Sequence, residues 1–200
     1  LDMGEDFLIM NQLLDKKMSI RFEKYQCLNC GEDKKIFRQG FCYDCFFKMP
    51  QAGDWVMKPE LSKAHLDIED RDLEFEKELQ LQPHVVYLAN SSDVKVGVTR
   101  KTQIPTRWID QGAHEAIVIV EVPNRYLAGI AEVALKDHVS DKTNWRKMLT
   151  NDIVDLDLNA EKERLSKFLP DEIKPYYSEF KSKEMEIEFP VLKYPTKINS

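Results

Sequence analysis

The 200-residue sequence lacks a long hydrophobic run, because no stretch of about 18 consecutive apolar residues occurs in it. Its first residues, Leu1 to Asp6, are acidic and lack the basic and apolar regions of a secretory signal peptide. We therefore expect a protein that does not span a membrane and that is located in the cytoplasm.

An excess of basic residues is also lacking, since 29 Lys and Arg stand against 35 Asp and Glu, for a formal net charge of −6. This balance excludes a uniformly basic nucleic-acid coat. Acidic residues concentrate in residues 51–83, whereas residues 20–50 and 84–149 carry a slight basic excess. A composition of 42% hydrophobic residues excludes outright disorder and is enough for one medium domain or two small ones.

No cysteine is spare, because all four fall in two Cys-x-x-Cys pairs: Cys27, Cys30, Cys42 and Cys45. This spacing strongly predicts a zinc site in which each pair covers one face of a tetrahedron. Four thiolates close the coordination sphere, so the metal is expected to be structural rather than catalytic. The alternative is two disulfides or a redox pair, which no secretory signal supports.

Residues 36–41 are typical of a short hairpin, and a helix is expected from Phe46. The turn around the first cysteine pair, called a zinc knuckle, together with this hairpin and helix resembles a treble clef. Lys34, Lys35 and Arg38 either form a solvated hairpin tip or contact nucleic acid, and the sequence leaves both open. His65 is a candidate fifth ligand, although a surface histidine is favoured because the cysteine set is complete.

The second half predicts the order strand, strand, helix, strand, helix, with strands at 84–89, 94–99 and 116–122, a helical turn from Pro105 and a helix at 125–139. Strand alternation puts Val94, Val96 and Val98 on one face and Lys95, Gly97 and Thr99 on the other. A three-residue loop from Asn90 to Ser92 would place Tyr87 opposite Lys95.

This hairpin resembles the core of the GIY-YIG nucleases. Val85-Val86-Tyr87 stands where Gly-Ile-Tyr would, and Lys95-Val96-Gly97 where Tyr-Ile-Gly would, so that Val85 and Lys95 depart from the pattern. In that superfamily an arginine follows on the next helix, here Arg107, and a metal-binding glutamate on a later one, here Glu132. Asn144 lies twelve residues further on, at the usual spacing.

More closely, residues 27–149 resemble an uncharacterised bacterial family that joins a treble-clef-like zinc knuckle to a GIY-YIG-like domain. The resemblance implies an α+β fold: a small four-cysteine zinc-binding module, and a domain with a short antiparallel sheet flanked by helices. We expect the zinc module at residues 1–50, a charged connector with one helix at 51–83, and the GIY-YIG-like domain at 84–150. Residues 151–200 are expected to form a tail, with a helix at 161–169 and an edge strand of an incomplete β element at 185–189.

The resemblance also implies a function, the Mg²⁺-dependent hydrolysis of phosphodiester bonds in DNA or RNA. Tyr87 would act as general base on a water that Lys95 helps to orient, and Arg107 would bind the scissile phosphate. Glu132 would hold Mg²⁺, and Asn144 would brace the site. Because the ordinary pKa of tyrosine is about 10, we expect Lys95 to lower the pKa of Tyr87.

Other readings of the same residues stay open. Tyr87 could be an aromatic residue packed in a strand, and Glu132 could form an ion pair with Lys136. Asn144 could cap a helix, and Arg107 could be a charge exposed to solvent. The chain would then be a non-catalytic module that binds nucleic acid or protein, which its acidic net charge favours. A third possibility is a protein-interaction adaptor of unknown partner with surface anchors at Trp55, Trp108 and Trp145.

Overall fold

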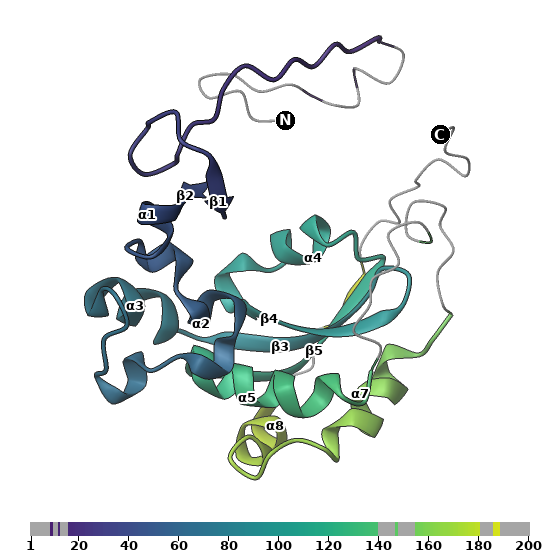
Figure 1. Cartoon of the computed structure of the whole chain (residues 1–200). Helices are drawn as coiled ribbons and strands as arrows, with labels where there is room; N and C mark the ends of the chain where they lie inside the picture. Colours follow the sequence, from purple (N-terminus) through teal and green to yellow (C-terminus); the bar gives the residue numbers. More distant parts are fainter. Residues whose placement is uncertain are drawn as a thin grey trace. The chain divides into compact units, whose positions relative to one another are not determined.

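The computed structural model describes residues 9, 12, 16–139, 147, 155–180 and 186–188 (Figure 1). The chain divides into two compact units, Leu1–Phe47 and Lys48–Ser200. Each unit has its own elements and its own buried side chains, so each is described by itself. No helix in the described ranges is long and apolar enough to cross a membrane.

The first unit is built on the predicted hairpin. Strand β1 (Ile36–Arg38) pairs antiparallel with β2 (Phe41–Cys42), and the chain turns through Gln39 and Gly40, whose φ angles are +50° and +81°. The positive φ favours glycine at position 40, where the Leu28 side chain packs against the turn. Helix α1 (Tyr43–Phe46) follows directly, three residues earlier than expected, with Cys42 as its N-cap.

A four-stranded antiparallel sheet forms the centre of the second unit, in the order β4-β3-β5-β6. Its strands are β3 (His84–Asn90), β4 (Val94–Arg100), β5 (Glu115–Val122) and β6 (Glu186–Glu188). With α4 (Thr106–Asp110) and α5 (Arg125–Lys136), they confirm the order predicted for residues 84–139. The edge strand expected at residues 185–189 is present as β6, but its assignment to an incomplete β element is wrong, because it pairs with β5 at the edge of this sheet.

The register of the β3–β4 hairpin differs from the prediction by two residues. Tyr87 lies opposite Gly97, and Lys95 lies opposite Ala89. The loop has three residues as expected, but it begins at Ser91, because Asn90 belongs to the strand. The Asn90 carbonyl accepts a hydrogen bond from the His114 N–H (2.8 Å), and the Asn90 side-chain amide donates one to Glu115 Oε1 (2.9 Å). These contacts extend β3 by one residue and shift every pair.

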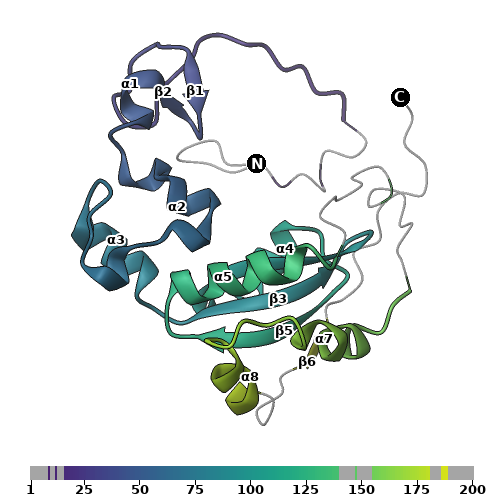
Figure 2. The same cartoon turned by 60° about the horizontal axis from the view of Figure 1, so that its bottom comes forward.

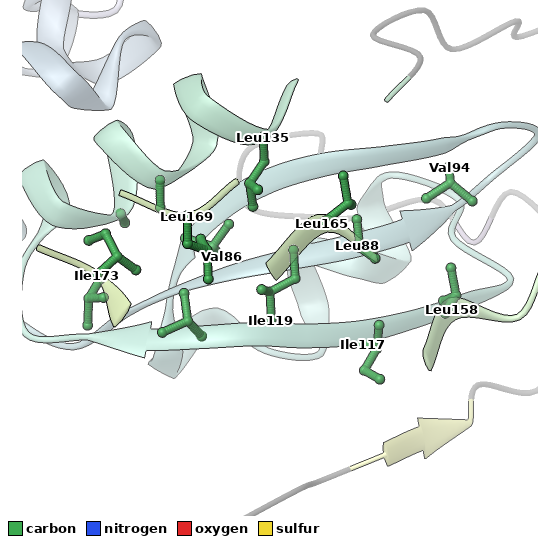
Figure 3. Close-up of a cluster of buried hydrophobic side chains, with 14 residues drawn as sticks. Val86, Leu88, Val94, Ile117, Ile119, Leu135, Leu158, Leu165, Leu169 and Ile173 are labelled. Carbon is green, nitrogen blue, oxygen red and sulfur yellow. The ribbon is translucent and has the colours of Figure 1, made fainter. Parts of the chain in front are cut away.

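The two faces of the sheet bury different sets of side chains. Val94, Val96 and Val98 join the larger core, as their alternation predicts, together with the residues labelled in Figure 3. The opposite face carries a smaller cluster around Tyr87 and Trp108. A bulge in β5 opposite Val86 and Tyr87 switches the alternation, so that Ile117 and Ile119 before it and Val120 and Val122 after it all reach the larger core.

Helices cover both faces, with α4 on the Tyr87 side and α5, α7 (Leu158–Ser166) and α8 (Lys174–Phe180) on the other (Figure 1). Figure 2 shows α5 lying along β3. The Asp157 carboxylate caps α7 by accepting hydrogen bonds from the Asn159 and Ala160 N–H groups. The C-terminal helix predicted for the tail therefore contributes to the main core.

Residues 51–83 pack as part of the second unit. They form α2 (Asp54–Met57), α3 (Leu73–Gln80) and three short 3-10 turns at Pro50–Ala52, Pro59–Leu61 and Ala64–Leu66. The buried Glu76 carboxylate accepts hydrogen bonds from the N–H groups of Asp70, Arg71 and Asp72 (2.7–3.1 Å), which fixes the turn before α3. His65 stacks on Tyr126, with 4.5 Å between ring centroids.

Two of the three tryptophans proposed as surface anchors are core residues. Trp55 is 5% exposed and Trp108 is 1% exposed, so neither offers an indole to a partner. Trp145 lies outside the described residues. The adaptor hypothesis loses its anchors at Trp55 and Trp108.

Gly129 on α5 permits the closest contact between the 51–83 segment and the sheet domain. A Cβ there would lie 2.2 Å from Glu60 N and 2.4 Å from Pro59 C, both backbone atoms. Helix propensity alone makes Gly129→Ala stabilising by roughly 0.5–1 kcal/mol. We expect instead a loss of about 1–3 kcal/mol in the free energy of unfolding, because backbone must move to admit the methyl group.

Denaturant unfolding measures this effect, with Lys136→Ala, an exposed position on the same helix, as the matched control. The control is expected to change stability by less than about 0.5 kcal/mol. A stabilised Gly129→Ala variant would contradict the contact.

Candidate functional site

The four cysteine sulfurs of the first unit lie within 4.8 Å of one another, and all four cysteines are free of disulfides. Cys27, Cys42 and Cys45 are buried, and Cys30 is exposed. Gly31, with φ of +70°, turns the chain directly after Cys30. Among the described residues this is the only group of three or more possible metal ligands. The disulfide alternative is therefore wrong.

Hydrogen bonds to sulfur support a metal-binding arrangement. The Cys42 N–H donates to Cys27 Sγ (3.3 Å), and the Asn29 amide donates to Cys45 Sγ (3.3 Å). Such donors orient thiolate ligands and stabilise their negative charge. Asn29, between the first two cysteines, is a supporting residue that the cysteine spacing alone did not identify.

The pKa values of the cysteine thiols differ. Backbone hydrogen bonds from Cys42 and Cys30 lower the pKa of Cys27 to about 6. The pKa of Cys30 rises to about 11, because desolvation and the neighbouring cysteines outweigh a hydrogen bond from the Glu32 backbone. A bound cation would favour the deprotonated form of these thiols, because only a thiolate acts as a metal ligand. The donor set fits Zn²⁺, which binds four thiolates as a closed tetrahedron.

In the second unit, the Tyr87 ring lies against Gly97 and beneath α4. A Cβ on Gly97 would meet Tyr87 Oη at 2.6 Å and Cζ at 2.7 Å, so the ring occupies the space that any larger residue would need. The ring packs against Trp108, with 5.8 Å between centroids. Its hydroxyl donates to Gln111 Oε1 (2.8 Å), and the residue has no exposed surface.

The predicted depression of the Tyr87 pKa is wrong. Burial raises the pKa of Tyr87 above 10, and the charge of Arg107 and the hydrogen bond to Gln111 only partly offset this effect. Glu132 raises it further, and Lys95 lies opposite Ala89 rather than opposite Tyr87. Tyr87 is therefore a protonated phenol at neutral pH, which weighs against a role as general base.

A cleft of about 380 Å³ opens beside this tyrosine. It is lined by two arginines, one carboxylate, an amide, a valine and hydroxyl groups: Val98, Thr99, Thr102, Gln103, Thr106, Arg107, Asp110 and Arg125. Arg107 is exposed, whereas Trp108 next to it is buried and holds α4 on the sheet. The Thr99 hydroxyl donates to Gln103 Oε1 (3.2 Å), which links β4 to the loop before α4.

Arg125, at the start of α5, is the second cation of the cleft, and the 51–83 segment fixes it. Its guanidinium donates to the carbonyl oxygens of Trp55 (3.1 Å) and Val56 (2.7 Å) and lies 5.6 Å from the Trp55 ring centroid. Burial lowers the pKa of Arg125. The positive charges of Arg100 and Arg107 lower it further, whereas the carboxylate of Glu132 raises it. Two other arginines thus act on Arg125, and one of them, Arg107, also lines the cleft.

The predicted site residues are only partly brought together. The charges of Arg107 and Glu132 both act on Tyr87, although Tyr87 and Glu132 do not line the cleft. Lys95 shares the sheet face of Tyr87 but sits two residues from Gly97 along β4. Asn144 lies outside the described residues, so its role as a brace stays a prediction. Whether Glu132 pairs with Lys136 or holds Mg²⁺ also stays open.

Two residues of this site, Gln111 and Arg125, were not identified from the sequence. Gln111 follows α4 and reads as an ordinary loop residue, since only the fold brings it to Tyr87. Arg125 stands one residue after the cap Asn124 and reads as a solvated helix terminus. Neither carries a local signal, because their partners lie 24 and about 70 residues away.

The family of the chain is shown by a match over residues 15–200 to the family described as "Protein of unknown function (DUF2797)". The chain belongs to this family. The expectation of a family of unknown function is thereby confirmed, while the likeness of DUF2797 to GIY-YIG nucleases stays a prediction. No curated protein and no solved structure matches the chain.

The cysteine cluster of this DUF2797 member predicts its metal content. We expect purified protein to contain about one zinc per chain and Cys27→Ser to lose most of it, because a tetrahedral thiolate site needs all four ligands. Zinc should be released as the pH falls, since protons compete with the metal for sulfur. Elemental analysis after gel filtration measures both effects.

Asn29→Ala is the graded control for this measurement, because it removes a donor to sulfur and leaves every ligand in place. We expect it to weaken zinc affinity by roughly 10-fold or more in competition with a chelator. Full zinc content in Cys27→Ser would contradict the tetrahedral site.

The buried tyrosine predicts an alkaline titration. Because the folded protein raises the pKa of Tyr87 above 10, its contribution to stability is complete below pH 10 and is lost as the pH rises. Absorbance at 295 nm should show one tyrosine of the wild type that ionises above pH 10 and is missing in Tyr87→Phe. The variant should also lose about 1–2 kcal/mol of stability, because Gln111 Oε1 loses its donor.

Tyr25→Phe, at an exposed tyrosine, is the matched control and should leave stability unchanged. A Tyr87→Phe protein as stable as the wild type would show that the Gln111 hydrogen bond contributes nothing.

Proposed function

We propose that this protein binds a nucleic-acid backbone at the cleft beside α4, with Arg107 and Arg125 as its phosphate contacts. The observation that carries the proposal is the lining of the cleft, in which two guanidinium groups and three threonine hydroxyls surround about 380 Å³. Guanidinium and hydroxyl donors are the groups that proteins use most for phosphate oxygens.

Electrostatics support an anionic ligand. Glu132 and Glu60 raise the pKa of Arg125 while Arg100 and Arg107 lower it, so the carboxylates compensate part of the repulsion among these cations. Asp110 offsets part of this charge within the lining. A phosphodiester bound between Arg107 and Arg125 would offset the rest.

We also propose that residues 84–150 are a GIY-YIG-like domain. Support comes from Tyr87 facing Gly97 across the first hairpin, Arg107 on the next helix and Glu132 on the helix after the third strand. This is the arrangement in which the resemblance places a phosphate-binding arginine and a metal-binding glutamate. In this proposal the four-cysteine unit holds a structural Zn²⁺, and the cleft takes the nucleic acid.

A second candidate function is Mg²⁺-dependent phosphodiester hydrolysis. The observation that favours it is that the charges of Arg107 and Glu132 both act on Tyr87. A single carboxylate suits Mg²⁺, which keeps several waters and takes phosphate oxygens as further ligands. Tyr87, as a buried and protonated phenol, would serve to position Gln111 and α4. The binding function requires none of this chemistry and is therefore the leading proposal.

Fluorescence anisotropy with labelled DNA and RNA oligonucleotides tests the proposal. We expect Arg107→Ala to weaken binding by roughly 10-fold at low salt and to reduce the salt-dependence slope by about 1, because one phosphate contact is lost. Lys167→Ala, an exposed cation on the opposite side of the sheet, is the matched control and should bind like the wild type.

If Arg107→Ala bound the oligonucleotides with unchanged affinity and unchanged salt dependence, the proposal that the cleft binds nucleic acid would be overturned. The same oligonucleotides incubated with Mg²⁺ or Mn²⁺ separate the two candidates. Cleavage by the wild type that is lost in Glu132→Gln would establish hydrolysis, whereas intact oligonucleotides with normal binding would leave the binding function alone.

A further inference from the structure

The zinc-binding unit exposes three aromatic rings on one surface. Phe37 is 43% exposed, Tyr43 is 61% exposed and Phe47 is 53% exposed. We call these three residues the aromatic platform. Scattered exposed aromatics are ordinary in proteins, but a contiguous group on so small a unit marks an interaction surface.

The three rings form one connected group. The ring centroids lie 5.2 Å apart for Phe37 and Tyr43, 5.0 Å for Tyr43 and Phe47, and 5.9 Å for Phe37 and Phe47. Phe46 lies beneath them, in contact with Phe37 and Phe47, and is 9% exposed. The hairpin β1–β2 and helix α1 hold the group, and two of the four cysteines stand in the same elements, so a bound metal would fix the platform.

One cation, Arg38, lies beside the platform, and a second, Lys35, stands two residues before Phe37 in the chain. The Arg38 guanidinium lies 5.4 Å from the Phe37 ring centroid. Two acidic side chains of the unit are engaged within it, since Glu32 pairs with Lys34 (2.7 Å) and Asp33 accepts a hydrogen bond from the Tyr25 N–H (3.1 Å), whereas Asp44 stands next to Tyr43 on α1. Within the described part of the chain, Arg38 and Lys35 form no ion pair, so their charges remain for a ligand.

We infer that the aromatic platform binds single-stranded nucleic acid by stacking its bases, with Arg38 and Lys35 on the phosphates. Exposed rings beside unpaired cations are the combination that single-strand binders use, because every base has a face that stacks and every linkage has a charge. Bases in a duplex are already stacked on one another, so the platform selects single strands. The inference takes its ligand class from the proposed function but rests on a different unit and different residues.

Leucine variants test the platform. Tyr43→Leu together with Phe47→Leu keeps apolar bulk and removes two ring faces. We expect the double variant to lose roughly 10-fold or more in affinity for a 2-aminopurine-labelled single-stranded DNA or RNA, and to lose the fluorescence quenching that marks a stacked base. Affinity for a duplex of the same sequence should be unchanged. Ile20→Leu, an exposed apolar position in the same unit, is the control.

Several outcomes would overturn the inference. Wild-type protein that leaves the 2-aminopurine signal unquenched would do so without any variant. Unchanged single-strand affinity in the double variant, or an equal loss for duplex and single strand, would do so as well. If the double variant instead lowered the unfolding temperature of the Lys48–Ser200 unit, the rings would serve a contact within the chain.

Arg107→Ala, measured beside the double variant, separates this inference from the proposed function. Loss in Arg107→Ala alone would support the cleft and reject the platform. Loss in the leucine variant alone would support the platform and reject the cleft. Zinc content is measured in each protein, and a variant that loses zinc is replaced by the single change Tyr43→Leu.

Discussion

The contact between the Tyr87 ring and the backbone of Gly97 is the constraint on which the sheet domain depends. With no side chain at Gly97, the ring lies flat on β4 and leaves the Tyr87 hydroxyl within 2.8 Å of Gln111 Oε1. Trp108 closes over the ring from α4. Because Trp108 faces the sheet, its neighbour Arg107 faces solvent, and a cleft forms where α4 meets β4 and the start of α5. The packing of Tyr87 on Gly97 thus determines where Arg107 lies.

The zinc unit depends on a different kind of constraint. A hairpin of two short strands and a four-residue helix bury too few apolar side chains to be stable alone. Four thiols within 4.8 Å replace that missing core when they share a metal. With a metal supplying that stability, the unit would need fewer aromatic rings inside it, and five of its described aromatic residues are exposed, among them the three of the platform.

The two units place their cations differently, and this bears on function. In the sheet domain, Arg125 is held by backbone carbonyls of the 51–83 segment, so that segment belongs to the site and is more than a connector. In the zinc unit, Arg38 rests on a ring. One arrangement places guanidinium groups among threonine hydroxyls, and the other places one beside exposed aromatic rings; these are the features on which the two proposed nucleic-acid contacts rest.

The sequence by itself determined the elements whose signals are local. Cysteine spacing identified the four metal ligands, and period-two alternation in residues 94–99 assigned each side chain to its face. The tertiary structure decided the rest, because the interactions responsible are distant in sequence. Hydrogen bonds with His114 and Glu115 make Asn90 part of β3 rather than of the turn. The cross-strand partner of Tyr87 is therefore Gly97 instead of the predicted Lys95. The acidity of Tyr87 was decided in the same way, since local sequence suggested a nearby lysine whereas burial beneath α4 raises its pKa.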